Sequence, residues 1–362
     1  MRAALALARR GLGQVAPNPV VGCIVVASDG RVAGRGWTQP GGRPHAETEA
    51  LARAGTAARG GTAYVTLEPC AHHGQTPPCS DALIDAGIAR VVAAVRDPDP
   101  RVAGRGIEAL RQAGIDVIEG LLENEAAELN AGFFLRVREG RPLVTLKVAT
   151  SLDGKIATAS GESQWITGEA SRARAHLMRA EHDAILIGAG TALADDPALT
   201  CRLPGMEGRS PIRILVDAAR RVPDSAQLFQ TARATATILA TGLAAGADAP
   251  GLRSLEAFGV EIMKLPPDGP NHVDLAELLQ ALGRRGLTRI MVEGGGGMGA
   301  ALLRLGLVDR IAWFRAPLLI GGEGIPAIAD LALARLTEAP GFERTGLETI
   351  GTDLLETYRR RA

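Results

Sequence analysis

One histidine and two cysteines lie close together in the first quarter of the chain, with a glutamate two positions after the histidine. They are His45, Glu47, Cys70 and Cys79. Imidazole and thiolate are ligands that zinc prefers, and a set of three protein ligands leaves the fourth position to water. Zinc lowers the pKa of such a water to about 7. The residue types therefore indicate hydrolytic zinc chemistry, with Glu47 placed to move protons beside the metal.

The pattern H-x-E followed by P-C is typical of zinc-dependent deaminases, in which the glutamate is a general acid and base and not a ligand. Here the segment AHHGQTPP separates the two cysteines, a longer spacing than the usual two residues. We expect this insert to form a loop, after which Cys79 begins a helix. His72 and His73 offer a fourth ligand for a structural zinc site, but we interpret them as loop residues that face a substrate.

A glycine-rich stretch late in the chain, VEGGGGMGAALLRLG, lies between a predicted strand and a predicted helix. Glycines let the backbone approach a phosphate, and the start of the helix offers N–H groups to it. A literal G-x-G-x-x-G is present at Gly294, Gly296 and Gly299, but no ribose-binding acid ends the next strand. Alone, the stretch is equally consistent with a nucleotide site and with a tight turn that binds nothing.

Length and composition favour a soluble two-domain protein. The chain of 362 residues is too long for one ordinary core. Lys+Arg and Asp+Glu both number 40, and this neutral balance argues against a nucleic-acid partner. No apolar run is long enough to span a bilayer, and the apolar start MRAALALARRG is too short for a signal peptide. Four cysteines do not form a disulfide scaffold. We expect a cytoplasmic protein without a membrane partner.

Strands alternate with helices in both halves, which predicts two α/β domains. In the first half we expect strands at 20–26, 62–67, 91–95 and 115–118, and helices at 45–54, 79–86, 105–113 and 122–139. In the second half we expect strands at 143–149, 184–188, 212–217, 236–240, 289–293 and 310–314. Gly140 and Pro142 end a helix before a strand, so the boundary is predicted between residues 1–141 and 142–362.

Seven stretches occur in one order: PNPVVGC, HAE, TLEPCAHHGQTPPC, VAGRG, SLDGKIA, GESQWITG and LADDPALT. Together they resemble the bifunctional riboflavin-biosynthesis proteins, a pyrimidine deaminase fused to a ribosyl reductase, over nearly the whole chain. The resemblance implies an N-terminal cytidine-deaminase-like α/β/α sandwich with Zn²⁺ on His45, Cys70 and Cys79. It implies a C-terminal dihydrofolate-reductase-like α/β domain that uses NADPH. The implied substrate is 2,5-diamino-6-ribosylamino-4(3H)-pyrimidinone 5′-phosphate, which is deaminated before its ribosyl group is reduced to ribityl.

The resemblance also implies residue roles. Glu47 is the proton donor, Asn18 holds the pyrimidine, and Lys147 and Asp195 polarise the sugar and relay a proton. The substrate in the second domain is lined by Ser163, Arg179, Leu199, Arg202 and Glu293, of which the two arginines are expected to clamp its phosphate. The cofactor is contacted by Ala149, Trp165, Thr191, Asp195, Gly295, Gly296, Gly297, Met298, Gly299, Ala300 and Ala301.

Three positions depart from the family's pattern. Thr38 stands where the family often has His, and Gln75 where it often has Lys or Arg. Both are plausible phosphate contacts, and loss of a cation is expected to weaken phosphate binding by on the order of 1 kcal/mol. At position 218 the family often has a residue whose hydroxyl contacts the cofactor, but this chain has Ala218 there, so that contact is not expected.

Two other functions are compatible with parts of the sequence. One is a nucleic-acid or nucleoside deaminase with an accessory nucleotide-binding domain. The other is a zinc-stabilised dimerisation module in which Glu47 is idle. The family's reductase domains tend to pair, so we expect a homo-oligomer, a dimer or tetramer, formed through the second domain.

Overall fold

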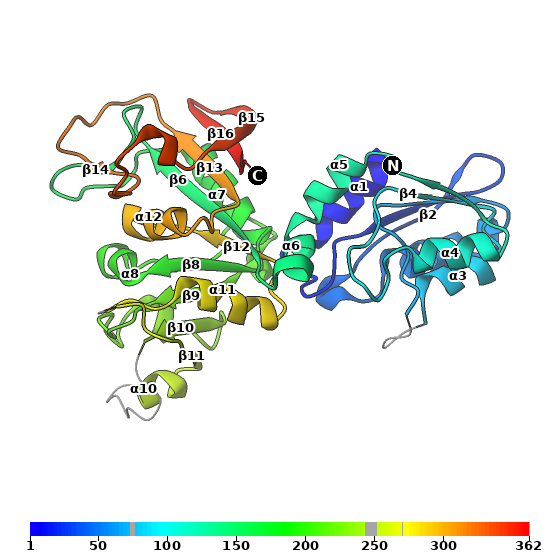
Figure 1. The fold of residues 1–362 in the computed structure, drawn as a ribbon, viewed down its shortest axis with the longest axis horizontal. Helices are drawn as coiled ribbons and strands as arrows, with labels where there is room; N and C mark the ends of the chain where they lie inside the picture. The colour runs from blue at the N-terminus through cyan, green and yellow to red at the C-terminus, as the bar shows by residue number, and fades with distance from the viewer. Residues whose placement is uncertain (73–76, 243–251, 270, 362) are drawn as a thin grey trace. The chain divides into compact units, whose positions relative to one another are not determined.

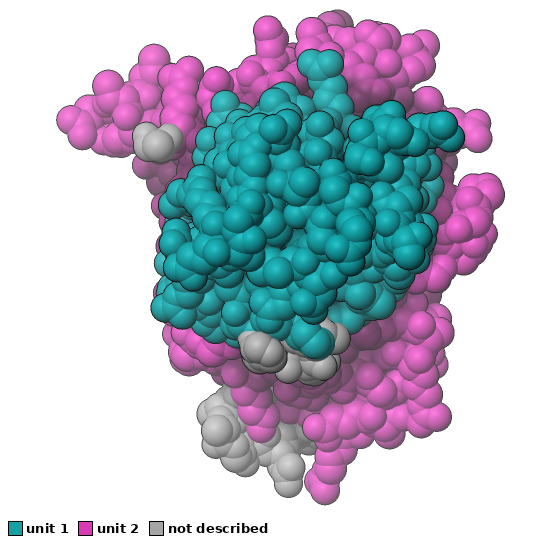
Figure 2. All heavy atoms as spheres, turned by 90° about the vertical axis from the view of Figure 1, so that its right-hand side faces the viewer, with its two compact units in different colours: residues 1–141, 285–288 teal, residues 142–284, 289–362 magenta. Residues whose placement is uncertain are grey.

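Residues 1–72, 77–242, 252–269 and 271–361 are described by the computed structural model (Figure 1). The chain divides into two units, Met1–Arg141 with Arg285–Thr288 and Pro142–Arg284 with Arg289–Ala362, which Figure 2 colours separately. Each unit contains a β-sheet of its own with helices between strands. The predicted α/β class is therefore confirmed. In the part of the chain that is described, no helix has the length and apolar character needed to cross a bilayer.

The sheet of the first unit has the strand order β2-β1-β3-β4-β5. Strand β1 is antiparallel to β2 and β3, whereas β3, β4 and β5 are parallel. The strands are β1 (Gly22–Val26), β2 (Val32–Trp37), β3 (Thr62–Val65), β4 (Arg90–Ala93) and β5 (Asp116–Glu119). Each predicted strand of this half is present, and β1 and β2 form the hairpin expected after VVGCIVV.

The helices of the first unit are α1 (Arg2–Ala8), α2 (Ala46–Ala54), α3 (Cys79–Asp85), α4 (Arg105–Gln112), α5 (Glu123–Leu129) and α6 (Ala131–Glu139). The single helix predicted at 122–139 is wrong, because Asn130 interrupts it. The buried amide of Asn130 donates to the carbonyl of Val20 and accepts from its N–H, both at 2.9 Å. This bond to a distant segment fixes the break between α5 and α6.

The sheet of the second unit has nine strands in the order β11-β10-β9-β8-β12-β6-β13-β16-β15 (Figure 1). Strands from β11 to β13 are parallel, and β16 is antiparallel to both of its neighbours. They are β6 (Leu143–Thr150), β8 (Ala184–Gly188), β9 (Ile212–Val216), β10 (Thr237–Thr241), β11 (Val260–Lys264), β12 (Arg289–Val292), β13 (Arg310–Arg315), β15 (Phe342–Ile350) and β16 (Asp353–Arg360). Two short strands, β7 (Lys155–Ala157) and β14 (Ile325–Pro326), pair separately.

The winding direction of this sheet changes at its centre. The chain runs from β6 to β8, moves outward through β9, β10 and β11, and returns to place β12 between β8 and β6. Strand β13 then adds on the other side of β6. Ligands bind outside the carboxyl ends of strands at such a switch point. The helices are α7 (Glu169–Ala180), α8 (Ala189–Asp195), α9 (Gln227–Gln230), α10 (Leu252–Ala257), α11 (Leu275–Arg284) and α12 (Gly296–Arg304).

Two candidate active sites

The side chains of His45, Cys70 and Cys79 converge in the first unit. His45 precedes α2, Cys70 follows β3 and Cys79 begins α3. Nδ1 of His45 lies 3.3 Å from Sγ of Cys79 and 3.7 Å from Sγ of Cys70, and the three ligand atoms lie within 4.8 Å of one another. Tetrahedral zinc with bonds of about 2.0–2.3 Å holds nitrogen and sulfur ligands roughly 3.6 Å apart. The three residues therefore fit a zinc ion.

No fourth ligand completes this cluster among the residues that the structure describes. His72 is described and is not part of it, and its buried Nδ1 has no hydrogen-bond partner among the described residues. Three protein ligands are typical of a catalytic zinc site with one open position. His73 and Gln75, and part of the predicted loop, lie outside the described residues.

Glu47 lies in the first turn of α2, buried beside the ligand cluster with 4% of its surface exposed. Burial raises the pKa of its carboxyl to about 7, and the charge of Cys70 acts in the same direction, while His45 and a hydrogen bond with Cys79 oppose the rise. A group with a pKa near neutrality can both accept and donate a proton during turnover. Glu47 thus has the position and the proton affinity of a proton shuttle.

The thiol of Cys70 is activated as a ligand. Hydrogen bonding with Cys79 is the largest cause that lowers its pKa to about 4, against the effect of burial. The backbone N–H of Cys79, at the first turn of α3, also donates to Sγ of Cys70 at 3.3 Å. Since the thiolate is the form that binds a metal, this environment prepares the site for one.

Glu68 fixes the backbone that carries Cys70, a role that sequence analysis did not identify. Its buried carboxylate accepts hydrogen bonds from the N–H groups of Asp97, Gly104 and Gly106 at 3.0–3.2 Å, around the start of α4. Gly106 is required here because a Cβ would overlap the carbonyl of Pro69. The signal in the sequence is an acid directly after the apolar stretch YVTL, two residues before a ligand.

Asn18 and Thr38 contact neighbouring backbone segments. Nδ2 of Asn18 donates to the carbonyl of Gly42 at 3.3 Å, so the loop before His45 orients the amide. The hydroxyl of Thr38 accepts from the N–H of Val21 and donates to the carbonyl of Pro19. Thr38 is only 2% exposed. It therefore holds the backbone of 19–21 instead of presenting its hydroxyl to a phosphate.

In the second unit, Lys147, Arg179 and Glu293 form one charged cluster. Val292, the last residue of β12, pairs with Leu146 of β6, so Glu293 directly after β12 comes beside Lys147 of β6. Nε and Nη2 of Arg179 donate to the two carboxylate oxygens of Glu293 at 2.8 and 2.9 Å, and Nζ of Lys147 lies 4.0 Å from the same carboxylate. Burial alone would raise the pKa of Glu293, but the two cations lower it to about 2.

This pairing changes the interpretation of the two predicted phosphate clamps. The third nitrogen of Arg179, Nη1, donates to the carbonyl of Thr200 at 3.1 Å, so the fork of this guanidinium is directed at groups of the protein. Arg202 is exposed, and its backbone N–H is held by Nδ1 of His176 at 3.3 Å. Of the two arginines, Arg202 is the one whose side chain faces solvent.

The glycine-rich stretch forms a cradle at the start of α12. The N–H of Gly295 donates to Oγ1 of Thr191 at 3.0 Å. Gly294 has φ +118°, and a Cβ there would overlap the same hydroxyl. Gly295 caps α12 without a side chain, and nothing lies within 4 Å of a Cβ built on Gly297. A glycine-rich helix start with open space beside Gly297 suits a phosphate, so these residues fit a dinucleotide cofactor.

The remaining predicted residues occupy the same unit. Ala149 is two residues beyond Lys147 on β6, so both lie on one face of the strand. Asp195 ends α8, and the buried Leu199 follows it with φ +53°. Ser163 and Trp165 lie on the loop between β7 and α7, where Trp165 is 65% exposed and the Arg172 guanidinium lies 4.6 Å from its ring centroid. Six of the predicted cofactor contacts lie in the first turns of α12, namely Gly296, Gly297, Met298, Gly299, Ala300 and Ala301.

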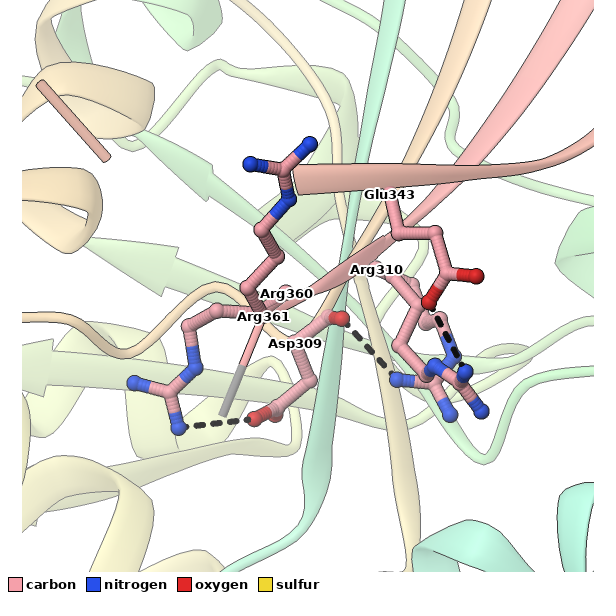
Figure 3. A pocket seen from close by; sticks show the side chains of 6 residues that line it. Asp309, Arg310, Glu343, Arg360 and Arg361 are labelled. Carbon is pink, nitrogen blue, oxygen red and sulfur yellow. Dashed lines mark hydrogen bonds and ion pairs between the residues drawn. The ribbon is translucent and has the colours of Figure 1, made fainter. Parts of the chain in front are cut away.

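A hollow of about 460 Å³ elsewhere in this unit is lined by Asp309, Arg310, Glu343, Arg359, Arg360 and Arg361 (Figure 3). Its basic and acidic groups pair with one another, since Arg359 donates to Glu343 at 3.0 Å and Nη2 of Arg360 lies 3.8 Å from Asp309. It lies at the amino end of β13, whereas the candidate reductase residues follow the carboxyl ends of β8 and β12. We therefore assign it no part in the site.

The fold and the two sites define a zinc-dependent deaminase joined to a nucleotide-dependent reductase. Residues 142–355 match the family model of the RibD C-terminal domain, and residues 1–95 match that of the cytidine and deoxycytidylate deaminase zinc-binding region. The chain belongs to the RibD family of riboflavin biosynthesis proteins, whose members combine a deaminase and a reductase. The family, fold, enzyme classes, zinc and NADPH implied by the sequence are confirmed.

Relatives match over the full length. The riboflavin biosynthesis protein RibD of Escherichia coli K12 is 44% identical, covering 98% of this chain and 96% of its own, and that of Aquifex aeolicus is 41% identical, covering 99% and 97%. Acinetobacter baumannii RibD superposes with a TM-score of 0.88 at 36% identity, covering 100% and 98% of the two chains. The Thermotoga maritima structure of a diaminohydroxyphosphoribosylaminopyrimidine deaminase/5-amino-6-(5-phosphoribosylamino)uracil reductase gives 0.87 at 37% identity, covering 100% and 97%.

Proposed function

We propose that residues 1–141 carry the deaminase site and residues 142–362 the reductase site of a bifunctional enzyme of riboflavin biosynthesis. The proposed substrate is 2,5-diamino-6-ribosylamino-4(3H)-pyrimidinone 5′-phosphate, and the final product is 5-amino-6-ribitylamino-uracil 5′-phosphate. The observation that carries the proposal is the three-ligand cluster of His45, Cys70 and Cys79 beside the buried Glu47. The name of the Thermotoga maritima relative supports the substrate class.

In the deaminase site, zinc supplies an activated water when it is bound. Glu47 would accept a proton as the water oxygen bonds to the ring carbon and would pass that proton to the ring nitrogen. A second proton on the exocyclic nitrogen would then let the C–N bond break, so that ammonia leaves and a ring carbonyl remains. General acid–base catalysis of this kind contributes about 10²–10⁴-fold. Asn18 holds the pyrimidine. We assign His72 to the substrate because its buried Nδ1 has no hydrogen-bond partner within the part of the chain that the structure describes.

In the reductase site, NADPH supplies the hydride when it is bound. The glycine cradle from Gly295 to Ala301 holds its phosphates, with Ala149, Trp165, Thr191 and Asp195 around the rest of the cofactor. Lys147 polarises the sugar oxygen and Asp195 relays a proton. Glu293 and Arg179 form one wall of the substrate site, and Ser163, Leu199 and Arg202 complete it, with Arg202 as the phosphate contact.

Replacing Glu47 with Gln tests the deaminase assignment. The variant should keep its zinc and its fold but release no ammonia, because an amide cannot carry the proton. It should still oxidise NADPH when given substrate that is already deaminated. Unchanged ammonia release would refute the assignment and favour a zinc-stabilised module with an idle Glu47.

Replacing Asp195 with Asn tests the reductase assignment in the same protein. NADPH oxidation with deaminated substrate should be lost, while ammonia release from the first substrate continues. If oxidation proceeds at the wild-type rate, Asp195 has no part in the mechanism. The neutral charge balance and the match to the RibD family favour this function over a nucleic-acid deaminase.

We also propose that the protein is a homo-oligomer, a dimer or tetramer joined through the reductase unit, and that it acts in the cytoplasm. Large apolar side chains are exposed on that unit, among them Leu319, Leu336 and Leu347 with 58–91% of their surface accessible. Exposed apolar side chains mark an interface where they form one contiguous patch. None of the four cysteines, all of them described, is in a disulfide, as suits a reducing compartment. Sedimentation of the purified chain tests the first point, and fractionation the second.

A further inference from the structure

Arg213 is a buried cation for which neither proposed mechanism has a use. It lies on β9 with 1% of its surface exposed. Its guanidinium makes six hydrogen bonds within the described residues, all to uncharged oxygens, namely those of Ala198, Leu228, Thr231, Thr235 and Thr237. Burial lowers its pKa to about 10, so it stays charged at neutral pH. A buried cation without a carboxylate partner is costly to desolvate, which points to a role beyond packing.

The bond to Ala198 connects Arg213 to the loop that follows α8. Nη1 of Arg213 donates to the carbonyl of Ala198 at 3.3 Å. The same loop contains two non-glycine residues with left-handed backbone, Asp196 at φ +38° and Leu199 at φ +53°. Residues other than glycine rarely adopt this left-handed backbone conformation. Where the surrounding structure holds them in it, they cluster at functional sites. The loop therefore needs restraints, and Arg213 supplies one of them.

A second restraint comes from α9, which Arg213 also holds. The carboxylate of Asp196 accepts the N–H of Gln227, the first residue of α9, at 2.8 Å. Arg213 donates to the carbonyl of Leu228 within α9 and to the hydroxyl of Thr231 just after it. The guanidinium thus fixes the helix and the loop to each other.

We propose that Arg213 is a positioning residue for the reductase reaction, in which its guanidinium holds the Ala198 carbonyl and so keeps Asp195 and Leu199 at the active site. This inference rests on the proposed function, which places those two residues against cofactor and substrate. Arginine suits the task because its planar fork serves partners in several directions, whereas a lysine ammonium has three donors on a flexible stem.

The test is Arg213→Lys in the full-length protein, with Leu278→Ala as the matched control. Leu278 is fully buried on α11 and lies outside the core cluster that contains Leu199 and Leu228, so its truncation leaves a cavity elsewhere in the same unit. Both variants should lower the Tm. Only Arg213→Lys should reduce kcat for NADPH oxidation, by at least about tenfold, because small displacements of reacting groups are costly. Ammonia release should stay within about twofold in both variants, since the deaminase residues lie in the other unit.

Two further measurements keep the inference open to refutation. If Arg213→Lys does not fold, Thr231→Val removes a hydroxyl that shares Nη1 with Ala198 and should lower the same kcat by a smaller factor. The double variant of Arg213→Lys with Leu199→Ala should lose less than the product of the two single losses, because both act through one loop.

Three outcomes would overturn the positioning role. In the first, kcat falls no further in Arg213→Lys than in Leu278→Ala at a matched loss of Tm. In the second, Thr231→Val leaves kcat unchanged. In the third, the losses of kcat in the double variant are multiplicative. A different result would defeat the proposed function itself: full NADPH oxidation by Asp195→Asn alone, whatever the Arg213 variants do.

Discussion

Replacing Glu293 with Gln should destabilise the reductase unit by about 3 kcal/mol near neutral pH. Arg179 and Lys147 lower the pKa of Glu293 from 4.5 to about 2 in spite of burial, and each pKa unit corresponds to about 1.4 kcal/mol. Glutamine keeps the shape of the side chain but leaves two partly buried cations without their counter-charge. The loss of one partner from a buried ion pair costs about 3–5 kcal/mol, which agrees with the value from the pKa.

The effect has a definite pH dependence. The pKa of Glu293 is lower in the folded protein than in the unfolded chain, so its contribution is fully present above about pH 4.5 and is lost as the pH falls toward 2. Glutamine does not titrate. The difference in unfolding free energy between wild type and Glu293→Gln should therefore be constant from pH 7 to 5 and should shrink between pH 4 and 3.

Urea unfolding followed by tryptophan fluorescence measures this difference. Trp165 and Trp313 lie in the reductase unit, so a Trp37→Phe background confines the signal to it. The control is Glu277→Gln, which breaks an exposed pair with Arg284 at 2.5 Å. Exposed pairs contribute about 0–1 kcal/mol. Equal losses in the two variants, or a Glu293 effect that persists undiminished at pH 3, would refute the reasoning.

Three other predictions concern the two sites. Gly294→Ala should weaken NADPH binding at least about tenfold in a fluorescence titration, since the new Cβ would overlap the Thr191 hydroxyl, and wild-type affinity would contradict the cradle. Gly42→Ala should raise KM for ammonia release severalfold with little change in kcat, because the Cβ would displace the Asn18 amide; a fall in kcat at constant KM would count against Asn18 as a binding residue. Removing zinc with a chelator should stop ammonia release and lower the Tm of the deaminase unit while reduction of deaminated substrate continues. Simultaneous loss of both activities would show that the two sites are not separate.

A helix or strand could be predicted from the sequence where its own residues show a distinctive hydrophobic pattern. The buried parallel strands are rich in β-branched residues, and all of those expected in the second unit are present. The hairpin of β15 and β16 was missed because FERTGLETI and DLLETYRR are polar sequences, and β15 is exposed along most of its length at the edge of the sheet. The break at Asn130 was missed for another reason, since it depends on a bond to Val20, 110 positions away.

The candidate sites divide in a similar way. The zinc ligands and Glu47 could be predicted because imidazole, thiolate and carboxylate at this spacing have a specific chemistry. The bidentate pairing of Arg179 with Glu293 could not, because the partners are 114 positions apart and no local pattern connects them. Glu68 was missed because its partners are backbone N–H groups, which every residue except proline possesses. Arg213 was missed because its partners are backbone carbonyls and threonine hydroxyls that only the fold brings together.

The two buried glutamates show why residue type alone does not assign proton chemistry. Glu47 and Glu293 are both almost inaccessible to water. The pKa of Glu47 is raised to about 7 by burial beside the sulfur of Cys70, whereas two cations lower the pKa of Glu293 to about 2. Glu47 can therefore exchange a proton near neutral pH, but Glu293 remains ionised throughout the reaction and acts by its charge. We therefore propose that the proton of the reductase step comes through Lys147 or Asp195.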